Sequence, residues 1–309
     1  MSRYFMGVDA GATRTRAIVA DEALKELGRA EGPPAAVDPR FPERAADTIA
    51  DLVGEAADRA GVPLPCAALW VGAAGAGRET TRSGVEMVLA RQGLADRVRV
   101  GTDVEAAFHE AHGEGPGIIL VSGTGSVAQG RGENGRIGRV GGWGSLIGDE
   151  GSGYAIGLEG LRRVARDEDG RGPETELRAA VLTALGLADV QELVAWAASA
   201  TKADVASLVP VVAESARDGD AVAGEILVQA VEELDGHVET LLDNLGPWSS
   251  RPRVALTGGL LHPGGPLRRG MEAALRRHNV GILGRVLYPA LGAVQLARAM
   301  ADEAEVSED

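Results

Sequence analysis

Three aspartates of this chain, Asp9, Asp103 and Asp149, stand beside turns that are rich in glycine or hydroxyl residues. Glycine lets the main chain approach a ligand closely, and consecutive backbone N–H groups make a concave site for a phosphate. A carboxylate nearby could hold a hydrated Mg²⁺ or accept a proton from a hydroxyl. The combination indicates phosphate chemistry.

The longest such stretch begins at Gly117. Residues 118–121 form an unbroken apolar run, as expected of a strand buried on both faces. The run leads directly into Gly123, Thr124, Gly125 and Ser126, where the glycines free the backbone and the two hydroxyls add donors. We interpret this turn as a cradle for phosphate.

A second glycine-rich stretch, GGWGSLIGDEGSG, covers residues 141–153 and surrounds Trp143. It contains Asp149 and leads into an expected helix that begins at Ser152. Such density of glycine and carboxylate is typical of a hinged cleft that closes on a ligand. Trp143 offers an apolar face to a ring, or it packs in the hinge; the residues alone leave both readings open.

The chain begins with an expected hairpin of strands at 5–9 and 16–20, and Asp9 stands at its first corner. Asp9 would face a hydrated Mg²⁺, while Gly11, Thr13 and nearby N–H groups would meet phosphoryl oxygens. An ordinary hairpin turn explains the same residues equally well.

Asp103 follows an expected strand at 98–100 and opens a helix at 104–111. Ligands of open α/β sheets bind at the carboxyl ends of the strands, so this carboxylate is well placed for chemistry. The alternative is a helix cap, a role that suits Thr102 and Asp103 alike. Glu105, His109 and His112 could share one helix face and bind a metal, but a solvated polar face is the better interpretation.

A third glycine turn, Gly258 and Gly259, follows an expected buried strand at 253–256. It could pass beneath a flat ring such as adenine.

The elements that must position these residues alternate between strand and helix, which predicts an α/β fold. From Gly117 the chain repeats the order of its first half, which indicates a structural duplication. The other expected elements are a helix around 46–56, a strand at 67–74, a helix at 79–92, a mainly helical segment at 158–245 and a last helix that ends at Met300. The segment 302–309 holds many carboxylates and is expected to be frayed or disordered.

Composition excludes several classes of protein. The net charge of −14 opposes binding to a nucleic acid. No apolar run reaches the ~18 residues of a membrane span, and the charged N-terminal residues do not resemble a signal sequence, so we expect a cytoplasmic protein. The single cysteine, Cys66, excludes an internal disulfide and is expected to be buried at the strand 67–71.

The ordered motifs DAGATRTR, GTD, LVSGTGS, GGWGSLIGDEGSGYAIG and LTGGLL resemble those of the N-acetylglucosamine kinases. These kinases belong to the BadF/BadG/BcrA/BcrD-type ATPase group of the actin, hexokinase and Hsp70 superfamily. The resemblance covers residue 7 to about residue 298. It implies two ribonuclease-H-like domains with an ATP cleft between them. The expected domains are 1–113 joined by a helix at 291–301, then 114–290 with a helical insertion, followed by the acidic tail 302–309.

The resemblance also implies roles for individual residues. Asp103 matches the base that accepts the proton of the sugar hydroxyl, and Asp9 would hold Mg²⁺ through water. The residues implied to bind ATP are Gly11, Thr13, Gly123, Thr124, Gly125, Gly258 and Gly259. The residues implied to bind the sugar are Ser126, Gly142, Trp143 and Asp149. The implied reaction is phosphorylation of an amino sugar by ATP, with N-acetylglucosamine 6-phosphate as the expected product.

One departure concerns the sugar. The kinases place an asparagine shortly after the third strand of the first domain, and residues 32–36 contain none. Another hexosamine or a wall-recycling sugar therefore remains an alternative substrate. Two other functions are an ATPase that activates a radical dehydratase, which would need more than one cysteine, and a nucleotide sensor without chemistry. The expected partners are a small-molecule sugar and, as an open alternative, a second copy in a homodimer, with no nucleic acid and no membrane.

Overall fold

The computed structural model describes residues 3–308, and the side chains as far as residue 304. The chain divides into two compact units, each described by itself below. Unit 1 comprises Met1–Gly115 together with Leu287–Asp309, and unit 2 comprises Pro116–Val286. No helix among the described residues is both long enough and apolar enough to cross a membrane.

Unit 1 is built on a five-stranded sheet in the order β3-β2-β1-β4-β5. β1 and β2 pair antiparallel, as do β2 and β3, whereas β4 and β5 join the sheet in parallel. The strands are β1 (Phe5–Ala10), β2 (Thr15–Ala20), β3 (Glu26–Gly32), β4 (Ala68–Ala73) and β5 (Val98–Thr102). The carboxyl ends of β1, β4 and β5 therefore lie at one edge of this sheet.

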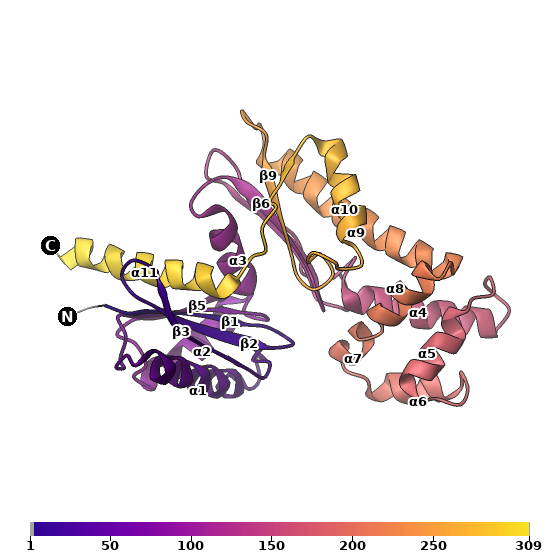
Figure 1. The fold of residues 1–309 in the computed structure, drawn as a ribbon, viewed down its shortest axis with the longest axis horizontal. Coiled ribbons are helices and arrows are strands. Elements are labelled where there is room, and N and C mark those ends of the chain that lie inside the picture. Colours follow the sequence, from indigo (N-terminus) through magenta and orange to yellow (C-terminus); the bar gives the residue numbers. More distant parts are fainter. Residues whose placement is uncertain (1–2, 309) are drawn as a thin grey trace. The chain divides into compact units, whose positions relative to one another are not determined.

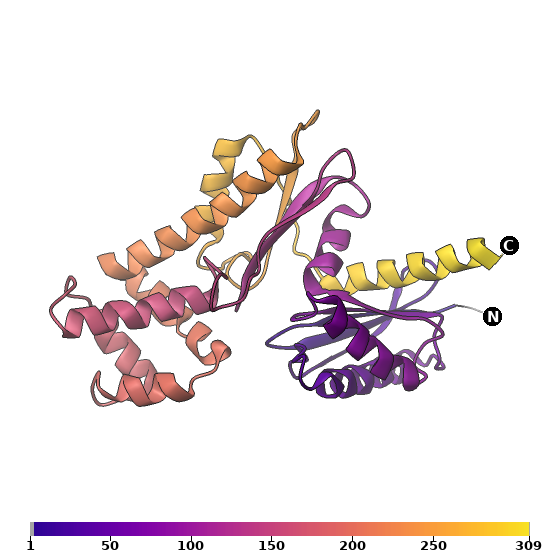
Figure 2. The same cartoon turned by 180° about the vertical axis from the view of Figure 1, so that it is seen from behind.

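Helices cover both faces of that sheet. Side chains alternate along a strand, so Met6 and Val8 face the core under α1 (Pro42–Ala60) and α2 (Glu79–Arg91), while Phe5 faces the opposite side. That opposite side packs against α3 (Asp103–His112) and α11 (Pro289–Glu308). Figures 1 and 2 both show the yellow α11 lying against this sheet beside α3.

The last helix is longer than predicted. The expectation that it ends at Met300 and that the acidic segment 302–309 is frayed was wrong, because α11 continues as helix to Glu308. Ala301 and Ala304 are still buried, so the helix has packing partners beyond the predicted end. Residue 309 lies outside the described residues. Cys66 is buried, as expected, and lies just before β4.

Unit 2 repeats the same sheet, with the order β10-β9-β6-β7-β8. β6 and β7 pair antiparallel, as do β7 and β8, whereas β9 pairs in parallel with β6, and β10 in parallel with β9. The strands are β6 (Gly117–Ser122), β7 (Ser126–Arg131), β8 (Ile137–Gly141), β9 (Arg253–Thr257) and β10 (Gly281–Ile282). The predicted duplication and the predicted α/β class with two ribonuclease-H-like domains are confirmed.

The segment predicted to be mainly helical, 158–245, is confirmed as such. Its helices are α4 (Gly153–Glu168), α5 (Leu177–Leu185), α6 (Glu192–Ser199), α7 (Lys202–Ala206), α8 (Val209–Arg217) and α9 (Ala221–Leu245). After β9 come α10 (Arg268–Leu275) and the 3₁₀ turn η1 (Arg276–His278). The long orange α9 of Figure 2 shares one aliphatic core with β6 and β9.

Candidate active site

In unit 1 three of the predicted residues lie at the end of β1 or in the turn that connects it to β2. Asp9 is the fifth residue of β1 and is partly buried. The turn is closed by the Gly11 N–H, which donates to the Arg14 carbonyl at 3.0 Å. Thr13 is exposed in this turn. A Cβ on Gly11 would lie 3.0 Å from the Arg14 carbonyl, so the tight turn favours glycine there.

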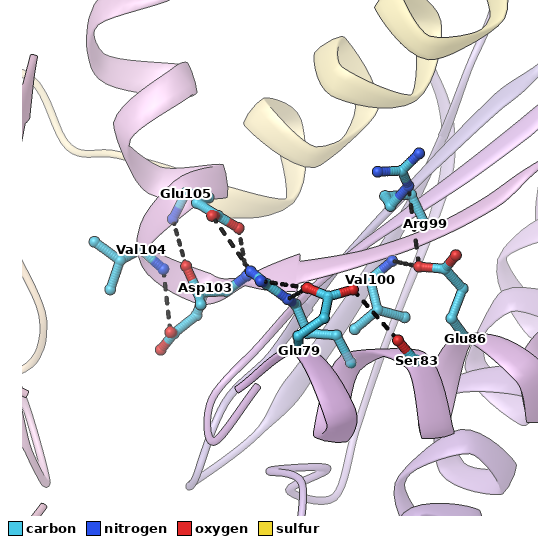
Figure 3. Close-up of polar contacts among 10 residues, drawn as sticks. Glu79, Ser83, Glu86, Arg99, Val100, Asp103, Val104 and Glu105 are labelled. Atoms are coloured by element: carbon cyan, nitrogen blue, oxygen red, sulfur yellow. Dashed lines mark hydrogen bonds and ion pairs between the residues drawn. The ribbon is translucent and has the colours of Figure 1, made fainter. Parts of the chain in front are cut away.

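Asp103 is the first residue of α3, at the carboxyl end of β5. Thr102, not Asp103, caps the helix: its hydroxyl accepts from the Glu105 N–H at 3.1 Å, and the Glu105 carboxylate accepts from the Thr102 N–H at 2.7 Å. The Asp103 carboxylate instead accepts from the Val104 N–H at 3.1 Å, the direction in which Figure 3 shows it pointing. The cap of α3 therefore does not depend on the Asp103 carboxylate.

Asp9 and Asp103 act on each other within unit 1. Burial raises the pKa of Asp9 to about 7, with the charge of Asp103 as the next cause, against smaller lowering effects of Arg16 and Arg14. The negative charges of the two carboxylates repel each other, and partial burial strengthens this repulsion. A divalent cation would relieve that repulsion, so the residues fit Mg²⁺.

The number of carboxylates at this place, two, also fits Mg²⁺. Among the described residues no three His, Cys, Asp or Glu side chains gather in a way that could hold a metal. Mg²⁺ commonly takes only one or two protein carboxylates and completes its shell with water and phosphate oxygens. The helix face predicted as an alternative metal site has other partners, since Glu105 belongs to the cap and His109 lies 3.4 Å from Glu114.

In unit 2 the turn from Gly123 to Gly125 is held by the start of α4. The Gly153 N–H donates to the Gly123 carbonyl at 2.7 Å, and the Tyr154 N–H donates to the Thr124 carbonyl at 3.3 Å. These bonds use the carbonyls of Gly123 and Thr124, and the Gly123 N–H donates to the Gly125 carbonyl at 2.9 Å, so it is the N–H groups of Thr124 and Gly125 that can face a ligand. The turn is thus fixed by main-chain bonds before any ligand arrives.

The hydroxyl of Ser126 is engaged inside the protein. Ser126 is buried and its Oγ donates to the Glu150 carbonyl at 2.6 Å, while the Ser122 Oγ donates to the Gly151 carbonyl at 2.9 Å. These two bonds tie the glycine-rich stretch 141–153 to the strand ends of β6 and β7. Ser126 therefore positions the loop that carries Asp149.

The third predicted turn lies beside the second. The Leu260 N–H donates to the Ser122 carbonyl at 3.1 Å, and a Cβ on Gly258 would fall 2.2 Å from the same carbonyl. Gly258 also has a φ of 93°, which favours glycine. A Cβ on Gly123 would lie 4.0 Å from the Gly259 nitrogen. The structure thus brings together the ATP-binding residues predicted in unit 2.

Asp149 lies in the same cluster and has a partner that the sequence did not indicate. Its carboxylate is buried, its φ of 62° is unusual for a residue other than glycine, and its Oδ2 forms an ion pair with Nζ of Lys202, the first residue of α7. A Cβ on Gly125 would lie 3.2 Å from both groups. No motif links Lys202 to Asp149, because 53 residues separate them.

Trp143 is the exposed member of the predicted sugar-binding set. Its exposed fraction is 74%, so the alternative of a tryptophan packed in the hinge is wrong. Its neighbour Gly142 has a φ of 69°, and the Gly142 carbonyl accepts from Arg139 at 2.7 Å. Leu146 and Ile147 of the same loop are also exposed. The loop thus presents apolar side chains outward from the position of Asp149.

A hollow of about 260 Å³ lies in unit 2 behind this loop. It is lined by Leu146 and Glu150 from the loop, by Tyr154 and Arg162 of α4, and by Glu233 of α9, among others. Asp149, Ser126 and Trp143 do not line it. The hollow is therefore separate from the residues predicted to bind the sugar.

Comparison with known proteins adds the family. The sequence profile of the BadF/BadG/BcrA/BcrD ATPase family matches residues 6–297. An N-acetylmuramic acid/N-acetylglucosamine kinase of Clostridium acetobutylicum is 31% identical over 84% of this chain and 86% of its own. An N-acetyl-D-glucosamine kinase of Dictyostelium discoideum is 28% identical over 95% of this chain and 97% of its own. A solved structure from Chromobacterium violaceum, provisionally assigned as an N-acetylglucosamine kinase, is 30% identical over 96% of this chain and 99% of its own, with a TM-score of 0.82.

Proposed function

Because the chain belongs to the BadF/BadG/BcrA/BcrD ATPase family and is similar to amino-sugar kinases over most of its length, we propose that it phosphorylates an amino sugar with ATP. The substrate we expect is N-acetylglucosamine, and the product its 6-phosphate. The observation that carries the proposal is the position of Asp103, at a strand end, beside Asp9 and outside the cap of its own helix.

In this mechanism Asp103 accepts the proton of the sugar hydroxyl. The hydroxyl oxygen bonds to the γ phosphorus of ATP while the bond from that phosphorus to the β–γ bridging oxygen breaks, and ADP leaves. A placed base of this kind contributes typically 10² to 10⁴ in rate. In phosphoryl transfer the protein mainly aligns the two substrates and neutralises the charge of the phosphates. Other residues are proposed for these tasks.

Phosphate binding is assigned to the glycine turns. The Gly11 and Gly123 N–H groups close their own turns, so the Thr13 N–H in unit 1 and the Thr124 and Gly125 N–H groups in unit 2 would donate to phosphoryl oxygens. Mg²⁺, held through water by Asp9, would neutralise the terminal phosphates when bound. Gly258 and Gly259, which lie against the Gly123 turn, would support the nucleoside.

Sugar binding is assigned to the loop of unit 2 that carries Asp149. Its carboxylate would accept from sugar hydroxyls, Gly142 and Trp143 of the same loop would also contact the sugar, and Ser126 holds the loop in place. A buried acceptor that needs a hydroxyl selects a polyol over an apolar ligand. The missing asparagine at 32–36 keeps N-acetylmuramic acid and glucosamine-type sugars open as substrates.

The alternative of an ATPase that activates a radical dehydratase has little support. The resemblance assigns to those activators an iron–sulfur cluster held by two cysteines from each chain, whereas this chain has one cysteine. Cys66 is buried, and burial raises the pKa of its thiol to about 12, so it is a poor thiolate ligand. Homodimer formation and a cytoplasmic location stay predictions.

The proposal is tested by incubating the protein with Mg-ATP and a panel of sugars, followed by mass spectrometry. The panel contains N-acetylglucosamine, glucosamine, N-acetylmannosamine, N-acetylmuramic acid and glucose. We expect one amino sugar to gain a phosphate, and Asp103→Asn to lose this activity by about 10² or more while still binding ATP. Asp51→Asn, an exposed carboxylate of α1, is the matched control and should be as active as the wild type. ATP hydrolysis without a phosphorylated sugar would contradict the kinase proposal.

A further inference from the structure

The contact between Lys202 and Asp149 has no place in the motifs that identify the family. The Asp149 side chain is only 5% exposed, and its Oδ2 lies against the Nζ of Lys202, whose side chain is 38% exposed. Taking a carboxylate out of water is costly unless another group pairs with it. Among the contacts of the described residues, Lys202 is the cation that pairs with Asp149.

Lys202 reaches Asp149 from a fixed base. It is the first residue of α7, and the helix start is held by a capping box in which Thr201 and Asp204 bond each other's main-chain N–H groups. α7 in turn packs on α4 at two glycines. A Cβ on Gly157 would fall 2.0 Å from the Val205 carbonyl, and one on Gly153 would fall 3.2 Å from the Ala206 Cβ. The main chain of α7 thus lies directly on α4.

Asp149 is fixed just as firmly on its own side. The Ser152 N–H donates to the Asp149 carbonyl at 3.1 Å, and the next residue, Glu150, is held through its carbonyl by Ser126. Both partners of the ion pair therefore project from rigid backbone. The pair fixes one carboxylate oxygen, Oδ2, whereas Oδ1 has no bond to any described residue and can accept from a ligand.

The choice of lysine is itself informative. Only two of the 31 lysine and arginine residues of this chain are lysines, Lys25 and Lys202. A guanidinium is planar and wide, whereas an ammonium is a compact point charge. Gly125 leaves little space beside the pair, because a Cβ there would lie 3.2 Å from the Lys202 Nζ. The limited space therefore favours the smaller cation here, in a chain whose other basic side chains are arginine except for Lys25.

We infer that Lys202 is a positioning residue for the sugar: its ammonium pairs with Oδ2 of Asp149 and orients the carboxylate, so that Oδ1 accepts from a sugar hydroxyl. The inference rests on the proposed function for its substrate class. It assigns to the helical insertion of unit 2 a part in sugar affinity that none of the sequence motifs indicates. In this inference Lys202 contacts Asp149 and does not contact ATP.

The kinetic test uses the full chain and the amino sugar that the wild type phosphorylates fastest. Lys202→Met should raise the KM for the sugar roughly 10- to 100-fold, as expected from the loss of a hydrogen bond to a charged group, with little change in the KM for ATP. Lys202→Arg should restore part of this loss, because it keeps the charge. Lys25→Met, at the other lysine, which is exposed in unit 1, is the matched control and should resemble the wild type.

A double-mutant cycle separates action through Asp149 from a direct contact with a ligand. If Lys202 acts through Asp149, then Asp149→Asn combined with Lys202→Met is no worse than Asp149→Asn alone. Additive losses, or a rise in the KM for ATP with an unchanged KM for the sugar, would overturn the inference.

A chemical test needs no activity, and its comparison of the two lysines in the wild type needs no variant. Brief treatment with acetic anhydride, read by mass spectrometry, should acetylate Lys25 readily and Lys202 slowly, and Asp149→Asn should make Lys202 reactive. Equal reactivity of both lysines in the wild type would overturn the inference. If the wild type and Lys25→Met phosphorylate no sugar at all, the proposed function fails, while the acetylation result still decides whether the ion pair forms.

Discussion

At the scale of single residues, the three aspartates that were predicted as site residues have three different environments. Asp9 is partly buried near another carboxylate, Asp103 opens a helix that another residue caps, and Asp149 is paired with a lysine. The roles that we propose for them differ accordingly: Asp9 would hold the metal ion, Asp103 would take a proton and Asp149 would accept from a hydroxyl.

The environment of Asp9 predicts a dependence of stability on pH. Its pKa is raised from 3.8 to about 7, so the folded protein binds a proton on Asp9 that the unfolded chain releases between these values. Folding is therefore penalised above pH 7, and the penalty is relieved as the pH falls toward 4. Asp9→Asn removes the charge and should raise the free energy of unfolding at pH 8, without Mg²⁺, by up to ~4 kcal/mol.

Urea denaturation of the wild type and Asp9→Asn at pH 8 and pH 5 measures this effect. The advantage of Asp9→Asn should shrink at pH 5, where Asp9 is protonated in the folded wild type. Excess Mg²⁺ at pH 8 should stabilise the wild type and leave Asp9→Asn unchanged. An equal response of both proteins to Mg²⁺ would show that Asp9 does not hold the ion.

At the scale of elements, glycine decides how closely helices pack. Gly157 of α4 lies against the main chain of α7, where a Cβ would fall 2.0 Å from the Val205 carbonyl. Gly157→Ala must therefore push α7 away or distort α4. We expect a loss of ~1–3 kcal/mol in the free energy of unfolding, the usual range for overpacking.

The matched control is Gly236→Ala in the middle of α9, where a Cβ would meet nothing within 4 Å. That substitution should stabilise the protein by ~0.5–1 kcal/mol, because alanine favours the helix more than glycine does. Both values come from urea denaturation. In Gly157→Ala the acetylation of Lys202 should also become faster, since α7 carries the lysine; unchanged protection of Lys202 would mean that the two helices separate without moving it.

The elements also show what the sequence could predict. The buried strand at 118–121, the helical start at Ser152 and the strand before Gly258 were each predicted within a residue or two, because apolar runs, caps and glycine turns are local signals. The ion pair of Lys202 with Asp149 was not predicted, since it depends on how α7 packs on α4. Likewise, the acidic composition of 302–309 predicted a frayed or disordered segment, whereas the helix α11 continues to Glu308.

The site was predicted unevenly for the same reason. The glycine turns at Gly123 and Gly258 were each predicted from local sequence, whereas their clustering follows from the parallel pairing of β6 and β9, which was not predicted. The sequence did not show whether Thr102 or Asp103 caps the helix, and in the structure the cap is Thr102. Nor did it show that the Ser126 hydroxyl holds the loop instead of facing a ligand. Side-chain direction, which decides both cases, is not a local property of sequence.

At the scale of the whole molecule, the chain builds unit 1 from both of its ends. The face of the first sheet that carries Phe5, Ile18 and Trp70 is covered by α11, whose buried positions recur at helical spacing. These buried positions are Ala290, Ala293, Val294, Ala297 and Ala301. Gly7 of β1 is part of this contact, because a Cβ there would fall 2.3 Å from the Val294 nitrogen. Unit 2, in contrast, has a core made wholly of residues between 116 and 286.

This arrangement predicts different fates for the two units when the last helix is removed. A chain that ends at Val286 would expose the α11 face of the first sheet, and that loss approaches the ~5–15 kcal/mol by which whole domains are stable. Unit 1 should therefore unfold, whereas unit 2 keeps its core. A chain that ends at Ala304 keeps every buried residue of α11 described here and should resemble the full-length protein.

Limited proteolysis with mass spectrometry distinguishes these outcomes. In the chain ending at Val286, peptides from residues 3–115 should appear within the time in which the full-length protein stays intact, while a fragment close to 116–286 should persist. Persistence of both regions would mean that the first sheet is stable without α11. Cleavage throughout the chain would mean instead that unit 2 also depends on the first, so that the two halves fold as one cooperative structure despite their separate cores.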